Sequence, residues 1–136
     1  MTLCEEGDDL HIGYNKRGAV EGYCSGGGIA QYGKGTAKEL GIRAEHGDEE
    51  AIRIYEKVGE DLGKTLAILI DILNPDTIVI GSIYVRSREF IEPAMRRVIA
   101  ERALEQSVSA CRILPAALGE SIGDVAALCV AETEGK

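Results

Sequence analysis

The stretch "LGKTLAILIDILNPDTIVIGS", residues 62–82, decides the fold of this chain. Its first part, "TLAILIDIL", is apolar at nearly every position, and Asp71 carries the single charge. A helix that is apolar all round is buried, so we expect this part to lie in the middle of a layered domain. Asn74-Pro75 ends the helix. "DTIVIGS" then predicts a buried parallel strand, because β-branched residues follow a proline and run to a glycine.

The sequence on either side of this stretch extends the pattern. Asp48 is the expected N-cap of the long helix, which should run to about Leu73. After the strand, Ser87 is expected to cap a helix that ends near Leu104 and holds Pro93 near its first turn or at a kink. "CRILPAAL" predicts a second strand, and "IGDVAALCVAE" a last helix.

The predicted order is therefore helix, strand, helix, strand, helix. This order is typical of a βαβ crossover behind a leading helix, so the predicted class is α/β with a small parallel sheet. Two or three strands make a thin sheet for such an apolar helix. We therefore expect partner strands upstream of this chain or in another subunit, and a homo-oligomer.

The composition and net charge of the chain argue against several classes of protein. The chain has 136 residues, of which 45% are hydrophobic, so one domain spanning residues 1–136 is expected and disorder is not. A net charge of −8 disfavours direct binding of nucleic acid by this segment. No apolar run reaches the length of a membrane span, and the first residues do not resemble a signal peptide. We expect a cytoplasmic protein.

A glycine-rich stretch, "SGGGIAQYGKGT" at residues 25–36, has the spacing of a phosphate-binding P-loop. A P-loop follows a buried strand and has small residues inside the loop. Here the preceding residues are polar, and Ile29 and Tyr32 are bulky. We interpret the stretch instead as helical, with short helices broken by residues 26–28, a cap at Gly33, and "TAKELGI" as a further helix that ends at Gly41.

The segment "RGAVEGYCSGGGI", residues 17–29, resembles the signature of the ROK family of sugar kinases and sugar-responsive repressors. Gly18, Glu21, Ser25 and Gly26 match the second half of that signature. Further pieces resemble the family in the same order: "GDEEA", the stretch at 62–82, "FIEPAMRRV" and "ILPAALGESIGDVAAL". The resemblance covers nearly the whole chain, and the ordered set is more specific than any one piece.

This resemblance implies the two-lobed actin-like ATPase (ribonuclease H-like) fold, in which sugar and ATP meet between the lobes. The chain looks like the carboxyl-terminal part of the second lobe, without the amino-terminal lobe. That lobe would carry the phosphate-gripping hairpin and the catalytic Asp, so no catalytic residue is assigned here. A full-length relative would use ATP with Mg²⁺.

The family pattern implies a sugar contact by Glu21, because a carboxylate offers two acceptor oxygens to neighbouring hydroxyls. It implies nucleotide contacts at Gly81, Ser82, Gly119 and Ser121, although Ser82 stands where the family has a second glycine. The zinc cysteines of the family would fall at Ile12, Tyr14 and Ala19. None of these is a zinc ligand, so no zinc is predicted.

Three functions stay open at this point. The chain resembles part of a sugar (hexose) kinase that contributes sugar binding and part of an ATP pocket and is inactive as an isolated chain. Alternatively, it resembles the sugar-sensing part of a repressor, which is not an enzyme and binds a hexose or amino sugar. A third possibility is a truncated reading frame that folds only as an oligomer.

Overall fold

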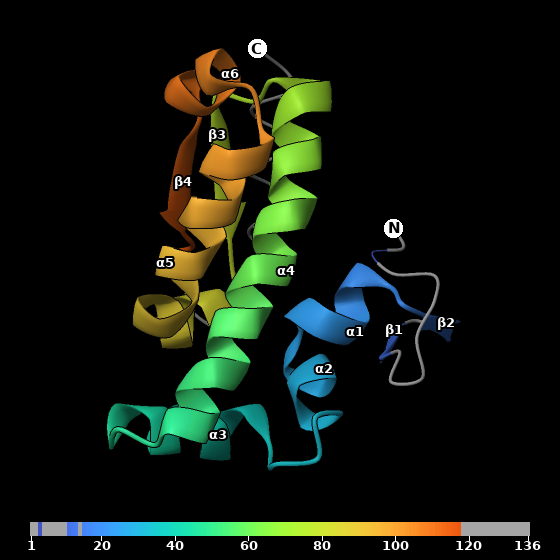
Figure 1. Cartoon of the computed structure of the whole chain (residues 1–136), viewed down its shortest axis with the longest axis vertical. Coiled ribbons are helices and arrows are strands. Elements are labelled where there is room, and N and C mark those ends of the chain that lie inside the picture. The colour runs from blue at the N-terminus through green and yellow to red at the C-terminus, as the bar shows by residue number, and fades with distance from the viewer. Residues whose placement is uncertain (1–2, 4–10, 14, 118–136) are drawn as a thin grey trace.

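The computed structural model describes residue 3, residues 11–13 and residues 15–117. A short antiparallel hairpin comes first, followed by four helices, a strand, two further helices and a last strand (Figure 1). These elements are β1 (Ile12–Gly13), β2 (Lys16–Arg17), α1 (Val20–Cys24), α2 (Gly26–Ala30), α3 (Ala37–Glu45), α4 (Glu49–Leu73), β3 (Thr77–Ile80), α5 (Ile83–Arg102), α6 (Glu105–Ala110) and β4 (Arg112–Pro115).

The long helix α4 is confirmed with the predicted ends. Asp48 is its N-cap, and its Oδ1 accepts hydrogen bonds from the backbone N–H groups of Glu50 and Ala51 at 3.0 and 3.2 Å. Asn74 ends the helix in the left-handed conformation, with φ 46° and ψ 53°. Asparagine adopts this conformation more readily than most residues, and Pro75 cannot continue the helix.

Helices α4 and α5 lie side by side and form most of the core (Figure 1). Their backbones approach closely at two glycines of α4. A Cβ atom at Gly59 would lie 2.3 Å from the carbonyl oxygen of Ile91, and one at Gly63 would lie 2.7 Å from that of Met95. Only glycine allows this approach, so these two positions fix how closely the helices pack.

Helix α5 begins earlier than predicted. Ser87 is not its first cap but a break inside it, with φ −126° and ψ 29°. The helix starts instead at Ile83, directly after the strand, because Ile83 and Tyr84 are buried against the core. Pro93 lies inside the helix, beyond this break and on an exposed face, so the kink is at Ser87 and not at the proline.

The predicted βαβ crossover is confirmed. Strand β3 pairs in parallel with β4, from Thr77 opposite Arg112 to Ile80 opposite Pro115, and α5 and α6 form the connection. The predicted burial is incomplete among the described residues. The strand that was predicted to be buried has no fully buried residue, and Val79 in it is 58% exposed. Ile72, at the end of α4, is 73% exposed.

Of the helices that precede α4, α1 and α3 contact it, and α2 contacts α1 and α3 (Figure 1). The break between α1 and α2 falls at Ser25, not at the glycine run, which lies inside α2. Helix α3 continues through Gly41 to Glu45, so the predicted end at Gly41 is wrong. A Cβ atom at Gly41 would lie 3.4 and 3.6 Å from the hydroxyl oxygens of Tyr55 and Ser87, which are ordinary contacts, so packing does not require glycine at this position.

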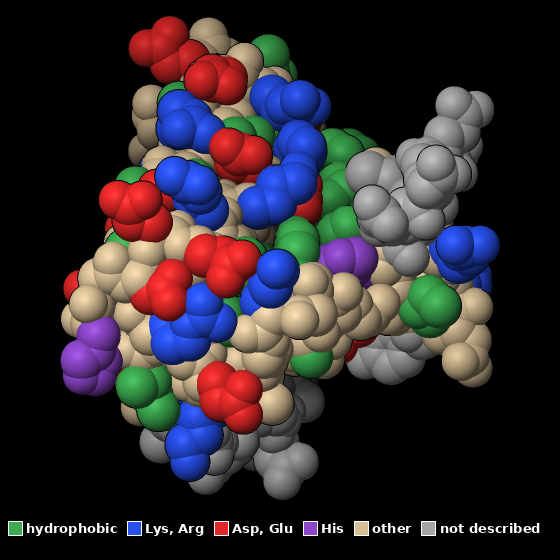
Figure 2. Space-filling model, turned by 60° about the horizontal axis from the view of Figure 1, so that its bottom comes forward, with side chains coloured by type: hydrophobic (Ala, Val, Ile, Leu, Met, Phe, Trp, Pro, Cys, Tyr) green, Lys and Arg blue, Asp and Glu red, His purple; other side chains and the backbone are tan. Residues whose placement is uncertain are grey.

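Along the face shown in Figure 2, basic and acidic side chains are interspersed. Ion pairs join several of the charged side chains among the described residues, as in the contact of Arg97 with Glu60 at 2.9 Å. In the part of the chain that the structure describes, no helix has both the length and the apolar character needed to cross a membrane. The predicted last helix at 122–132 lies outside the described residues.

Candidate functional site

Glu21 lies in the first turn of α1, and its side chain is exposed. Its backbone is held by Ser25, whose hydroxyl donates to the carbonyl oxygen of Glu21 at 2.6 Å and accepts from the N–H of Gly28 at 2.9 Å. One side chain thus joins the end of α1 to the start of α2. Ser25 therefore separates α1 from α2 and, through its hydroxyl, holds the two short helices together.

Three glycines allow the backbone around Glu21 to pack closely. A Cβ atom at Gly13 would lie 2.7 Å from the Cβ of Glu21, so the hairpin lies directly against this residue. One at Gly22 would lie 2.9 Å from the carbonyl carbon of His11, and one at Gly28 would lie 2.3 Å from the carbonyl oxygen of Gly22. The hairpin, α1 and α2 therefore form one tightly packed unit behind an exposed carboxylate.

The structure also shows what the glycine-rich stretch at residues 25–36 does. Gly28 is buried inside α2, and its role is helix packing. Lys34 forms an ion pair with Glu50 at 3.3 Å. The C-cap of α2 is Gln31, so the predicted cap at Gly33 is wrong; Gly33 lies in the turn that follows, with φ 73°. These positions agree with the interpretation of the stretch as helical and not as a phosphate-binding loop.

A buried polar cluster lies beneath α1, where this helix meets α4. Asp61 is 2% exposed; its Oδ1 contacts the ammonium groups of Lys57 and Lys64 at 3.1 and 3.4 Å, and its Oδ2 has no hydrogen-bond partner among the described residues. Burial, followed by the charges of Asp61 and Glu21, raises the pKa of Cys24 to about 12. Cys24 is therefore a neutral thiol at physiological pH and not a nucleophile.

The second predicted location, Gly81-Ser82, lies between the end of β3 and the start of α5. Ser82 is exposed and has φ 54° and ψ −127°, a conformation that favours glycine. The ends of parallel strands are where ligands collect in such folds. The predicted positions Gly119 and Ser121 lie outside the described residues.

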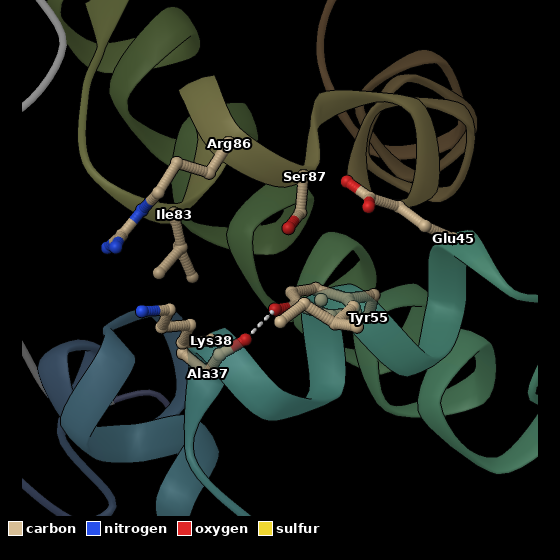
Figure 3. Close-up of a pocket in the computed structure, with 9 residues that line it drawn as sticks. Ala37, Lys38, Glu45, Tyr55, Ile83, Arg86 and Ser87 are labelled. Atoms are coloured by element: carbon tan, nitrogen blue, oxygen red, sulfur yellow. Dashed lines mark hydrogen bonds between the residues drawn. The ribbon is translucent and has the colours of Figure 1, made fainter.

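A pocket of about 260 Å³ opens beside this turn, between α3, α4 and the start of α5 (Figure 3). Lys38 and Arg86 lie on one side of it, and the hydroxyl of Ser87 points into it. Tyr55 forms part of the floor, and its hydroxyl donates to the carbonyl oxygen of Ala37 at 2.8 Å. The pocket joins an apolar lining to positive charge on this side and to the carboxylate of Glu45 on the opposite side. A ligand that carries a ring and an anionic group would place the anionic group at the side of Lys38 and Arg86.

The start of α2, which follows the helix that carries Glu21, lies near the start of α5. The Cγ2 atom of Ile83, which directly follows Ser82, lies 3.8 Å from the Cβ position of Gly26, which directly follows Ser25. Sequence reasoning missed Lys38, Arg86 and the rest of the pocket. These residues lie on helices that meet only in the folded chain, and no motif marks them.

Within residues 11–13 and 15–117, no group of three or more His, Cys, Asp or Glu side chains is placed to hold a metal ion. The absence of zinc from this protein stays a prediction.

The sequence model of the ROK family matches residues 10–134, and the chain belongs to this family. Over 70 residues, which are 52% of this chain, it is 37% identical to the DNA-binding transcriptional dual regulator NagC of Escherichia coli K12. The same values hold for the N-acetylglucosamine repressor of Shigella flexneri. The matched region spans only 17% of the length of these curated relatives.

Two solved structures share the fold. One is a ROK family transcriptional regulator, a homologue of the E. coli MLC protein, with a TM-score of 0.64 and 21% identity over 80% of this chain and 34% of that chain. The other is a putative sugar kinase from Cytophaga hutchinsonii, with a TM-score of 0.69 and 14% identity over 84% of this chain and 44% of that chain. They confirm the predicted fold class: a helix-rich part of an actin-like ATPase fold with a small parallel sheet.

Proposed function

We propose that this chain supplies the sugar-recognising part of a ROK protein, and that the Glu21 carboxylate accepts hydrogen bonds from hydroxyls of a hexose or amino sugar. The observation that carries the proposal is the combination of an exposed carboxylate with a fixed backbone. A rigid support lowers the cost of ordering the acceptor when the ligand binds. Two carboxylate oxygens suit two neighbouring hydroxyls.

The pocket beside Gly81-Ser82 supports a finer version, in which the chain is the carboxyl-terminal part of a sugar kinase. In this version the apolar lining takes the adenosine of ATP, and Lys38 and Arg86 face its phosphates. Phosphoryl transfer also needs Mg²⁺ and a base. The family resemblance implies a base on the amino-terminal lobe, so the chain alone is expected to be inactive.

The alternative version is the sugar-sensing part of a transcriptional repressor. The identity of this chain to NagC and to an N-acetylglucosamine repressor, 37% over 70 residues, favours this alternative. So does Ser82, because a side chain at this turn restricts the approach of a nucleotide to the backbone. A repressor needs the sugar contact at Glu21 but does not need ATP.

Both versions share a test on the 136-residue chain. Amide NMR signals of α1 should shift when N-acetylglucosamine or glucose is added, with a Kd on the order of 1 mM for so small a contact. Glu21→Gln should abolish the shifts, because an amide offers one acceptor oxygen in place of two. Glu56→Gln, at an exposed glutamate of α4, is the matched control and should leave them unchanged. Identical shifts in wild type and Glu21→Gln would rule out the proposed contact.

The same spectra separate the two versions. In the kinase version, ATP should shift the signals of Ile83 and Ser87, which line the pocket. In the repressor version, ATP should leave these signals unchanged while the sugar still shifts α1. Arg86→Ala should weaken a true ATP response, whereas Arg53→Ala, at an exposed arginine of α4, should not.

A further inference from the structure

We propose that His11 is a positioning residue that holds α1, and with it Glu21, in place by contacts that need no metal ion. The inference rests on the sugar contact proposed for Glu21, because it explains how that carboxylate is kept in position. His11 is 8% exposed and lies just before β1, outside the core formed by α4 and α5.

Two hydrogen bonds tie His11 to both sides of Glu21. Its Nδ1 lies 2.8 Å from the carbonyl oxygen of Gly22, and because a carbonyl can only accept, the ring nitrogen donates. Its own carbonyl oxygen accepts from the N–H of Gly18 at 2.8 Å. Gly18 precedes α1 and Gly22 lies within it, so one residue holds the backbone before and after the proposed sugar contact.

The imidazole ring also joins α1 to the segment after α2. It stacks on Tyr23 with ring centroids 4.8 Å apart and planes at 14°. It meets Tyr32 edge-on, with centroids 4.5 Å apart and planes at 74°. Both are favourable geometries for aromatic pairs. The buried side chain of His11, which comes from the hairpin segment, therefore contacts both α1 and the residues that follow α2.

The contacts of His11 explain how this region is held together without the zinc site that the family resemblance implies. The positions that would carry zinc cysteines hold Ile12, Tyr14 and Ala19, and none of these is among the Cys, His, Asp and Glu side chains that hold zinc in proteins. The donor set therefore does not fit the metal. In this chain His11 makes the link between the hairpin and α1 that bound zinc would otherwise provide.

The test compares hydrogen exchange of backbone amides in variants of the 136-residue chain, followed by mass spectrometry of a peptide that covers α1. In His11→Ala, amides of α1 should exchange at least about tenfold faster, while those of α4 and α5 keep their wild-type rates. His46→Ala is the matched control. The Nδ1 of His46 bonds to the carbonyl oxygen of Ile42 at 2.7 Å on an exposed end of α3, so this change should leave α1 unaffected.

A conservative variant separates positioning from general packing. His11→Phe keeps a ring between Tyr23 and Tyr32 and removes the Nδ1–H donor, so exchange in α1 should fall between wild type and His11→Ala. The affinity for N-acetylglucosamine should weaken in the same order, about tenfold for His11→Ala. Added zinc or a chelator should change neither exchange nor affinity in wild type.

Unchanged exchange in α1 of His11→Ala would overturn the proposal, and so would protection of α1 by added zinc in wild type. Because exchange is measured without sugar, it tests His11 even if Glu21 binds none. A chain whose α1 loosens in His11→Ala but which never binds sugar would retain the His11 link and refute only the proposed function.

Discussion

Replacing Gly59 by alanine tests how closely α4 and α5 must pack. In an exposed helix this change stabilises the protein by about 1 kcal/mol, because alanine is the better helix former. Here the added Cβ would lie 2.3 Å from the carbonyl oxygen of Ile91 and 3.2 Å from the Cβ of Ala94. Ordinary contacts of this kind begin at 3.4 Å, so the α5 backbone must retreat by about 1 Å.

We expect overpacking to cost about 3 kcal/mol, which leaves a net loss of about 2 kcal/mol after the gain in helix propensity. In a chain of this size such a loss lowers the melting temperature by roughly 8 °C. Urea denaturation and thermal melting followed by circular dichroism measure both values. Gly27→Ala is the control, because the nearest atom to its Cβ position is the Ser25 hydroxyl oxygen at 3.9 Å. A Gly59→Ala protein as stable as wild type would refute the reasoning.

Three further predictions follow from other parts of the chain. Ser82→Gly should stabilise it by about 1 kcal/mol in urea, since φ 54° strains a serine more than glycine costs in entropy; a loss of stability would contradict this. Hydrogen bonds, the largest from Arg88, lower the pKa of Glu92 to about 2. The contribution of Glu92 to the free energy of unfolding is therefore full above pH 4.5 and disappears as the pH falls towards 2. Acid titrations should show a loss on the order of 1 kcal/mol in this range, which should be absent in Glu92→Gln. The 136-residue chain alone should phosphorylate no hexose in an ADP-release assay, and any turnover above background would contradict the proposal that the base lies on the amino-terminal lobe.

The sequence predicted the elements that depend on local signals. Asp48, with acidic residues after it, and Asn74-Pro75 give the two ends of α4, because caps and helix-stopping residues act within one turn. The order of helix and strand then gave the parallel pair, since a right-handed crossover is nearly obligatory. Family membership followed from several such pieces in order.

What the sequence could not give depends on contacts between distant residues. Gly26 to Gly28 were predicted to break a helix, but close contact of Gly28 with the Gly22 carbonyl holds these residues inside one. The pocket of Lys38 and Arg86 exists only where two helices meet. The burial of Asp61 likewise could not be predicted from the sequence, because charged residues lie on either side of it along the helix.

The parallel pairing of β3 with β4 has a consequence for how the chain is made. All of α5 and α6 must leave the ribosome before β4 can reach β3, its one partner among the described strands. Helices α4 and α5 are neighbours along the chain and can associate first, whereas the sheet closes late because its contacts are non-local. In that interval the apolar segment "TIVI" has an unpaired strand edge. Strand β3 is therefore the point at which crowding of nascent chains should first lead to aggregation.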